Sequence, residues 1–170
     1  MNVNDTTLYY EVHGAGPPLV LLHGLGSSTR DWELQLPAFA PHFEVVLVDV
    51  RGHGRSARPP GSYSVPQFAA DVAGLLRHLG KGPVHIVGIS MGGMVGLQLA
   101  ADFPDLLRSL VVVNAVPALQ PHSWRDWLQA WQRMAIIRLL GMRHMGNYLA
   151  GRLFPEPHQA DLRATIRERW

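Results

Sequence analysis

The chain contains no cysteine among its 170 residues, which excludes disulfide bonds and metal sites built on thiolate ligands. Long apolar runs are also missing, because no stretch approaches the roughly 20 apolar residues of a membrane-spanning helix. Residues 1–5 show no basic region followed by an apolar run, so we expect no signal peptide. The sequence therefore predicts a cytoplasmic protein without a membrane segment.

The chain also has no large excess of positive or negative charge. The formal net charge is +2 at pH 7, and no basic run is interleaved with aromatic residues, so we expect no nucleic-acid partner. What the chain does have is apolar content, since 47% of its residues are hydrophobic and a packed core is feasible. A length of 170 residues is typical of one domain.

The most informative segment is a Gly-x-Ser-x-Gly pattern at 88–92, centred on Ser90. An apolar run at 84–87 precedes it, and a stretch of helical character at 93–100 follows it. In such a strand–turn–helix, side chains at the flanking positions would clash, and the serine hydroxyl projects above the sheet as a nucleophile. A plainer interpretation is a serine that caps the helix it introduces. The strand before and the helix after favour the nucleophile.

A second motif is His23-Gly24, which directly follows the apolar run at 19–22. Glycine lets the backbone turn at the strand end, so that the next amide points into the site. The amides of Leu25 and Met91 are therefore expected to form an oxyanion hole. We predict a structural role for His23, with its ring bonded to nearby backbone.

A third motif is the apolar run 45–50, followed by the glycine-punctuated loop 51–56. With these three motifs in this order and spacing, residues 8–114 resemble the N-terminal part of the α/β-hydrolase superfamily, of the esterase, lactonase and haloperoxidase-like kind. The resemblance implies that Ser90 is the nucleophile and that residues 49–56 are mainly structural.

The fold class expected is α/β, a mostly parallel sheet with helices on both faces. Strands that are apolar throughout are typical of a sheet covered on both sides. The expected strands are 19–22, 45–50, 84–89 and 109–114, with an antiparallel edge strand at 7–12, and the expected helices of this region are 31–40 and 66–79. Residues 1–116 would form this core and residues 117–170 a helical lid.

In the lid region, Trp124, Trp127 and Trp131 recur at helical spacing after a capping serine at 123. Two interpretations stay open. The tryptophans line an apolar acyl pocket, or they pack the lid onto the core. Two further helices are expected over 142–154 and from 158 to 170.

The remaining members of a catalytic triad are not apparent. Chain order in this fold is serine, acid, histidine, and the strand 109–114 ends in Asn114, which cannot be the acid. The resemblance implies further strand–helix units that bring both groups, and the apolar run 110–113 would otherwise be an open sheet edge. We therefore expect a C-terminal polypeptide segment to complete the fold. The acids and histidines after Asn114 fall in the expected lid helices and are left unassigned: Asp126, Glu156, Asp161, Glu168, His122, His144 and His158.

The function expected is a carboxylesterase-like serine hydrolase, which cleaves a small carboxylic ester or lactone through an acyl-enzyme on Ser90, without metal or organic cofactor. Two alternatives stay open. One is a perhydrolase or a carbon–carbon bond hydrolase on the same serine. The other is a non-catalytic ligand-binding module, since a serine without a base is a poor nucleophile. We expect residues 1–170 alone to be inactive.

Overall fold

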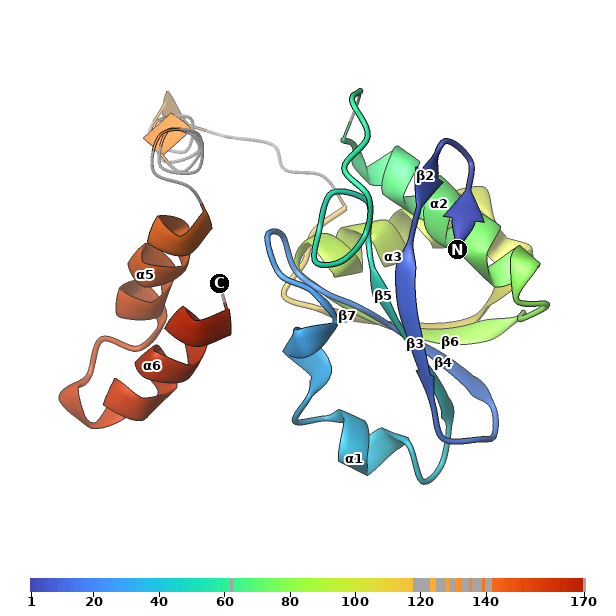
Figure 1. The fold of residues 1–170 in the computed structure, drawn as a ribbon, viewed down its shortest axis with the longest axis horizontal. Coiled ribbons are helices and arrows are strands. Elements are labelled where there is room, and N and C mark those ends of the chain that lie inside the picture. Colours follow the sequence, from blue (N-terminus) through green and yellow to red (C-terminus); the bar gives the residue numbers. More distant parts are fainter. Residues whose placement is uncertain are drawn as a thin grey trace. The chain divides into compact units, whose positions relative to one another are not determined.

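The computed structural model of the chain describes residues 1–61, 63–117, 123–124, 128, 131–132, 135, 139 and 142–169. The chain divides into two compact units, Met1–Ala118 (unit 1) and Leu119–Trp170 (unit 2). Figure 1 shows the elements of both units in chain order.

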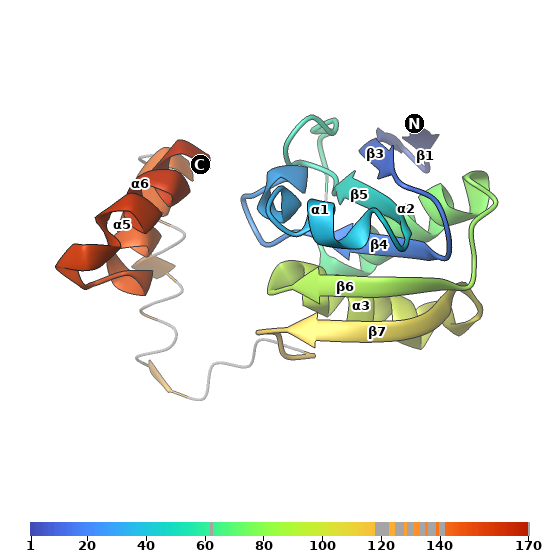
Figure 2. The same ribbon diagram turned by 90° about the horizontal axis from the view of Figure 1, so that it is seen from below.

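Among the described residues, unit 1 contains a five-stranded sheet of order β3-β5-β4-β6-β7 (Figure 2). β3 runs antiparallel to β5, whereas the other neighbouring pairs are parallel. The expected α/β fold with a mostly parallel sheet is thus confirmed. The strands are β1 (Asn2–Val3), β2 (Thr6–Thr7), β3 (Tyr9–His13), β4 (Pro18–Leu22), β5 (Glu44–Asp49), β6 (Val84–Ile89) and β7 (Leu107–Val113), of which β1 and β2 form a separate pair.

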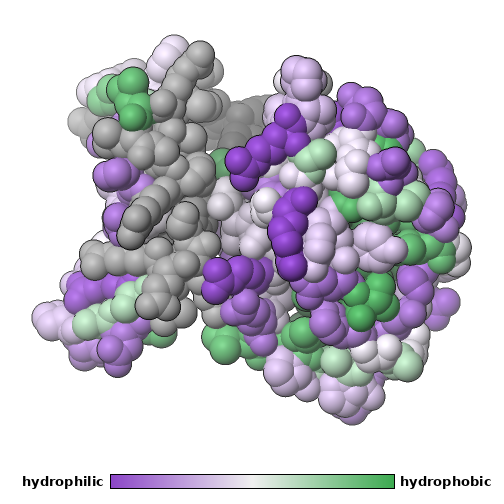
Figure 3. All heavy atoms as spheres, in the orientation of Figure 1, coloured by the Kyte–Doolittle hydropathy of each residue, from purple (hydrophilic) through white to green (hydrophobic). Residues whose placement is uncertain are grey.

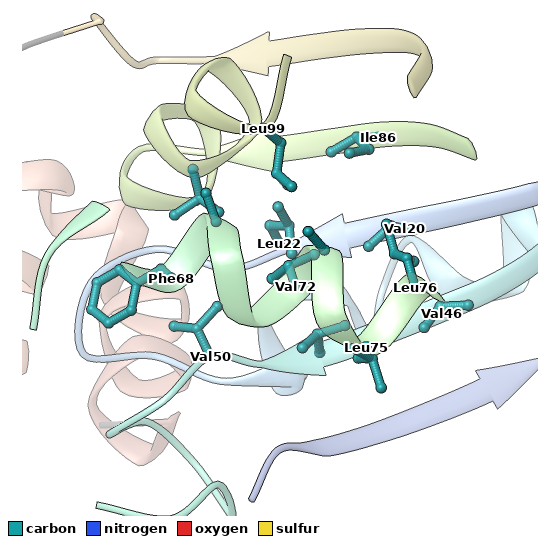
Figure 4. Close-up of a cluster of buried hydrophobic side chains, with 14 of the residues drawn as sticks. Val20, Leu22, Val46, Val50, Phe68, Val72, Leu75, Leu76, Ile86 and Leu99 are labelled. Carbon is teal, nitrogen blue, oxygen red and sulfur yellow. The ribbon is translucent and has the colours of Figure 1, made fainter. Parts of the chain in front are cut away.

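The strand β4 shows why the central strands are continuous apolar runs. Its last four side chains are all at most 4% exposed, because alternate residues enter cores on opposite faces of the sheet. Val20 and Leu22 pack with α2 (Val65–His78) and α3 (Met91–Asp102) on one face, as Figure 4 shows.

On the outer surface of unit 1 drawn in Figure 3, hydrophobic and hydrophilic side chains are interspersed.

The opposite face is covered over β4 and β5 by two short helices, η1 (Thr29–Trp32) and α1 (Leu36–Phe39). The single helix expected over 31–40 is therefore wrong. Pro37 lies in the first turn of α1, where its missing N–H is harmless. In a continuous helix the same residue would remove a hydrogen bond and clash with the preceding turn.

The helix α2 begins and ends where its sequence predicts, within one residue. The Ser64 side chain accepts a hydrogen bond from the Gln67 N–H at 3.4 Å, and Pro66 occupies the first turn. Gly80 adopts φ +63° just after the last turn, a conformation that glycine reaches at no steric cost.

The strand β7 follows η2 (Pro104–Leu106) and pairs with β6 alone among the described strands. Its valines at 111, 112 and 113 are exposed, with Val111 at 52%. An apolar strand with one free side is a ready template for pairing with another strand.

Unit 2 is helical in its described part. It contains α5 (Met142–Leu153), η3 (Pro157–Gln159) and α6 (Ala160–Arg169), close to the helices expected over 142–154 and 158–170, and α5 packs against α6. None of the described helices of the chain is long and apolar enough to cross a membrane.

Candidate active site

Ser90 lies between the end of β6 and the first residue of α3. Its backbone has φ 51° and ψ −116°, a strained combination for a residue with a side chain. The Ser90 N–H donates to the carbonyl of Val113 at 2.9 Å, and its own carbonyl accepts from the Met94 N–H at 3.1 Å. Because the residue itself is exposed, its hydroxyl is accessible.

The glycines that flank Ser90 are required by close backbone contacts. A Cβ atom on Gly88 would lie 2.3 Å from the carbonyl oxygen of Gly92. A Cβ atom on Gly92 would lie 2.2 Å from the carbonyl oxygen of Leu22, at the end of β4. Any other residue at either position would therefore push the strand and the helix apart. This is the strand–turn–helix geometry of a nucleophile elbow.

A tight turn over residues 24–27 lies beside Ser90, and we call it the 24–27 turn. The Ser27 N–H donates to the Gly24 carbonyl at 3.2 Å, and Gly26 supplies the φ of +74° that the third position of a type II turn needs. A Cβ atom on Gly24 would lie 3.8 Å from the Cβ of Ser90, which brings the turn and the serine together.

His23 is fully buried and bonds to backbone through both ring nitrogens. Nε2 accepts from the Val50 N–H at 3.1 Å, so the proton of the neutral ring is on Nδ1, which donates to the Gly24 carbonyl at 2.7 Å. Burial lowers the pKa of His23 and keeps the ring neutral. His23 is thus structural, as expected, and it fixes the plane of the peptide between Gly24 and Leu25.

The two predicted oxyanion donors, the amides of Leu25 and Met91, differ in setting. The carbonyl of Gly24 is held by His23, and in a trans peptide the next N–H, that of Leu25, points the opposite way. Met91 is buried and is the first residue of α3, where N–H groups have no intrahelical acceptor.

Asp49 joins the segment after the 24–27 turn to the loop after β5. The carboxylate is fully buried, with Oδ1 accepting from the Thr29 N–H at 2.6 Å and Oδ2 from the Arg55 N–H at 2.8 Å. Gly54 is essential to this contact, because a Cβ there would lie 2.1 Å from Oδ2 of Asp49. The sequence indicated a structural role for residues 49–56, but it did not show these partners.

A buried ion pair anchors the same loop to α2. Arg51 donates to Asp71 from Nε at 2.6 Å and from a terminal nitrogen at 2.9 Å, and both side chains are at most 3% exposed. The hydrogen bonds that Arg51 donates to Asp71 and Asp5 raise the pKa of its guanidinium. Asn4 adds a donor to Asp71 at 2.7 Å. Sequence reasoning missed this network, since its members are up to 67 residues apart.

The predicted pocket tryptophans belong to unit 2, whereas Ser90 belongs to unit 1. Trp124 and Trp131 are helical and exposed at 70% and 68%, and Trp127 lies outside the described residues. His144 and His158 are exposed, and His122 lies outside the described residues. Unit 1 has no histidine after Ser90. Within the described part of the chain, no three acidic or histidine side chains converge as in a metal site.

Fold and site together define a hydrolase-like α/β protein, and comparison with known proteins gives its family. Residues 17–142 match the model of the alpha/beta hydrolase fold, so the chain belongs to the α/β-hydrolase fold family.

Two of the curated relatives are named as hydrolases. A putative carbamate hydrolase RutD of Azorhizobium caulinodans is 41% identical over 110 residues, which is 65% of this chain and 42% of that protein. The 2-(acetamidomethylene)succinate hydrolase of Mesorhizobium japonicum is 32% identical over 152 residues, or 89% of this chain and 54% of the relative. The chain thus spans about half the length of these relatives.

Among solved structures, the enol-lactonase of Burkholderia xenovorans LB400 is similar at a TM-score of 0.83 and 31% identity. The similarity covers 98% of this chain and 65% of the lactonase. The likeness therefore extends over almost every element of the chain.

Proposed function

We propose that the complete protein is a serine hydrolase, which cleaves a carboxylic ester or lactone through an acyl-enzyme on Ser90. The observation that carries the proposal is the strained backbone of Ser90, with φ 51° at an exposed strand–helix turn. Strain of this kind persists where the surrounding structure imposes it, and the contacts of Gly88 and Gly92 impose it here.

In the first step, the Ser90 hydroxyl attacks the acyl carbon and loses its proton to a base. Negative charge then develops on the former carbonyl oxygen. The amides of Leu25 and Met91 are proposed to bind this oxyanion. In support, the Leu25 amide is turned away from His23 and the Met91 amide lies at the positive end of α3. The tetrahedral intermediate then collapses: the ester C–O bond breaks, the alcohol leaves with the proton held by the base, and the acyl-enzyme remains. Water attacks the acyl-enzyme and gives a proton to the same base, and the acid is released as Ser90 regains its proton.

The base and the acid of the triad are proposed to come from a C-terminal polypeptide segment that pairs with β7. Three observations support this. Unit 1 has no histidine after Ser90, β7 has one free side among the described strands, and the relatives are about twice as long as the matched region. Asn114, which follows β7, cannot accept a proton as a carboxylate would.

The substrate class follows the chemistry of the relatives. The relatives are named as hydrolases of a carbamate and of 2-(acetamidomethylene)succinate, and the similar solved structure is an enol-lactonase. An acyl-enzyme is a common intermediate for such bonds. We further propose that the exposed indoles of Trp124 and Trp131 serve as an apolar surface for the acyl chain, with Trp127 on the same predicted helix.

Labelling with a fluorophosphonate tests the proposed function. The complete polypeptide should be labelled on Ser90, and Ser90→Ala should abolish both labelling and turnover. Ser109→Ala is the matched control, because this exposed serine near the start of β7 is bonded to His85 and should leave labelling unchanged. Labelling that survives in Ser90→Ala would overturn the assignment. Weak turnover would not, since the remaining site can retain about 10³–10⁴-fold acceleration over water.

A further inference from the structure

Asp31 bonds to both ends of the 24–27 turn. Its Oδ2 accepts from the Gly24 N–H at 3.3 Å, and its Oδ1 accepts from the hydroxyl of Ser27. A Cβ atom on Gly24 would lie 4.0 Å from Asp31 Oδ2 and 3.8 Å from the Cβ of Ser90. The carboxylate and the serine thus flank the same glycine.

The helix that carries Asp31 is fixed on both sides of this residue. On one side, the Thr29 N–H donates to buried Asp49 at 2.6 Å. On the other side, Trp32 is 7% exposed and packs in the cluster of Leu21 and Leu47. The Asp31 N–H itself donates to the Ser28 carbonyl at 3.1 Å. The carboxylate is therefore presented to the turn from a segment that is held on both sides by buried contacts.

Gly24 is held at both of its backbone polar groups. Its carbonyl accepts from His23 and from the Ser27 N–H, and its N–H donates to Asp31. Two fixed ends leave little freedom to the peptide that carries the Leu25 amide. Without Asp31, Gly24 would be held by its carbonyl alone, and glycine has the widest backbone freedom of all residues.

We infer that Asp31 is a positioning residue for the oxyanion contact. It acts through the 24–27 turn, by holding the Leu25 amide in the direction that the transition state requires. The inference rests on the proposed function, because it takes Ser90 as the nucleophile and Leu25 as a donor. Small displacements of such a donor are costly, since an error of about 1 Å in a reacting group can lower a rate by 10²-fold.

Three variants of the complete polypeptide test the inference. Asp31→Ala removes both contacts and should lower kcat by about 10- to 10²-fold with KM nearly unchanged, as expected for an interaction made in the transition state. Asp31→Asn should retain most of the activity, because its amide oxygen accepts from Gly24 and its amide nitrogen donates to the Ser27 oxygen. Glu33→Ala is the control, since this carboxylate of the same segment pairs with Arg30 and should leave kcat unchanged.

A second measurement separates positioning from general stability. Hydrogen exchange of the Gly24 and Ser27 amides should accelerate in Asp31→Ala, while the amides of β4 and β6 keep their protection. Unchanged kcat in Asp31→Ala, or equal losses in Asp31→Ala and Asp31→Asn, would overturn the inference and leave the function of Ser90 intact. Fluorophosphonate labelling that persists in Ser90→Ala would instead overturn the proposed function, and the positioning role of Asp31 with it. Amide exchange would then still show whether Asp31 holds the turn.

Discussion

The residues that precede Ser90 and those that follow it in unit 1 differ in how their surroundings hold them. Before Ser90, the buried side chains of His23, Asp49, Arg51 and Asp71 bond the strand-end loops to one another. After it, β7 carries three exposed valines and is followed by Asn114, which has φ 50°. One side of the candidate site is thus held by many polar contacts, while the other side has a strand whose outer edge has no neighbour among the described strands.

The two edge strands of the sheet, β3 and β7, also differ: charged side chains protect β3 but not the valines of β7. On β3, Glu11 accepts from the Tyr9 hydroxyl at 3.0 Å and from His13 at 2.9 Å, and it also pairs with Arg55. The Arg55 guanidinium lies 3.6 Å from the centre of the Tyr9 ring. Charged side chains on an edge strand discourage pairing with other chains. β7 has no such protection at its valines, so its free side is suited to receive a strand.

The largest test of this difference is to express residues 1–170 alone. We expect an oligomeric, insoluble or molten product without ester hydrolysis above background, because the β7 edge is open among the described strands and the triad base is proposed to come from a further segment. The complete polypeptide should be monodisperse by light scattering and active. A monomeric 170-residue chain that unfolds cooperatively would contradict the argument from the edge. If it also hydrolysed esters, alanine substitution at His122, His144 and His158 would identify the base.

Removing the buried Arg51–Asp71 ion pair, which lies before Ser90 in the chain, should have a smaller but still large effect on the free energy of unfolding. Arg51→Ala leaves the buried carboxylate of Asp71 without its partner, and loss of a buried pair costs about 3–5 kcal/mol of unfolding free energy. Arg77→Ala is the control, since its exposed side chain lies 4.0 Å from Asp105 and such surface pairs contribute about 0–1 kcal/mol. Denaturant unfolding of the complete polypeptide measures both. Equal losses of unfolding free energy in the two variants would show that the buried Arg51–Asp71 pair stabilises the fold no more than a surface pair does.

Features that depend on residues close together in the sequence could be predicted, whereas contacts between distant residues could not. The apolar runs 19–22, 45–50 and 84–89 correspond to β4, β5 and β6 within one residue, because full burial on both faces requires a continuous run. The pattern around Ser90 is equally local, since the crowding that demands glycine arises within one turn. The single helix expected over 31–40 is wrong because a new helix begins near Pro37. The spacing of the hydrophobic residues alone does not indicate this break.

The supporting contacts of the site were not predictable in the same way. Asp49 bonds to Thr29 across 20 residues, and Arg51 bonds to Asp71 across the same separation. Aspartates in loops are common in sequences, and their partners depend on how the strand ends come together in space. Asp31 is nearer to Gly24, at seven residues, yet its role becomes visible only when the turn between them is known. The sequence therefore predicted the strand–turn–helix at Ser90 but not the contacts that hold its neighbouring loops.

The smallest expected effect on stability concerns the tryptophans of unit 2. Trp124 and Trp131 are 70% and 68% exposed, so replacing either by alanine should change the unfolding free energy little. If they contact the acyl chain as proposed, the same variants should shift the preferred acyl length, measured as kcat/KM over a series of ester chain lengths. Leu162→Ala is a control, as another exposed apolar side chain of unit 2. Losses of about 3–5 kcal/mol with unchanged preference would instead mark the tryptophans as packing residues.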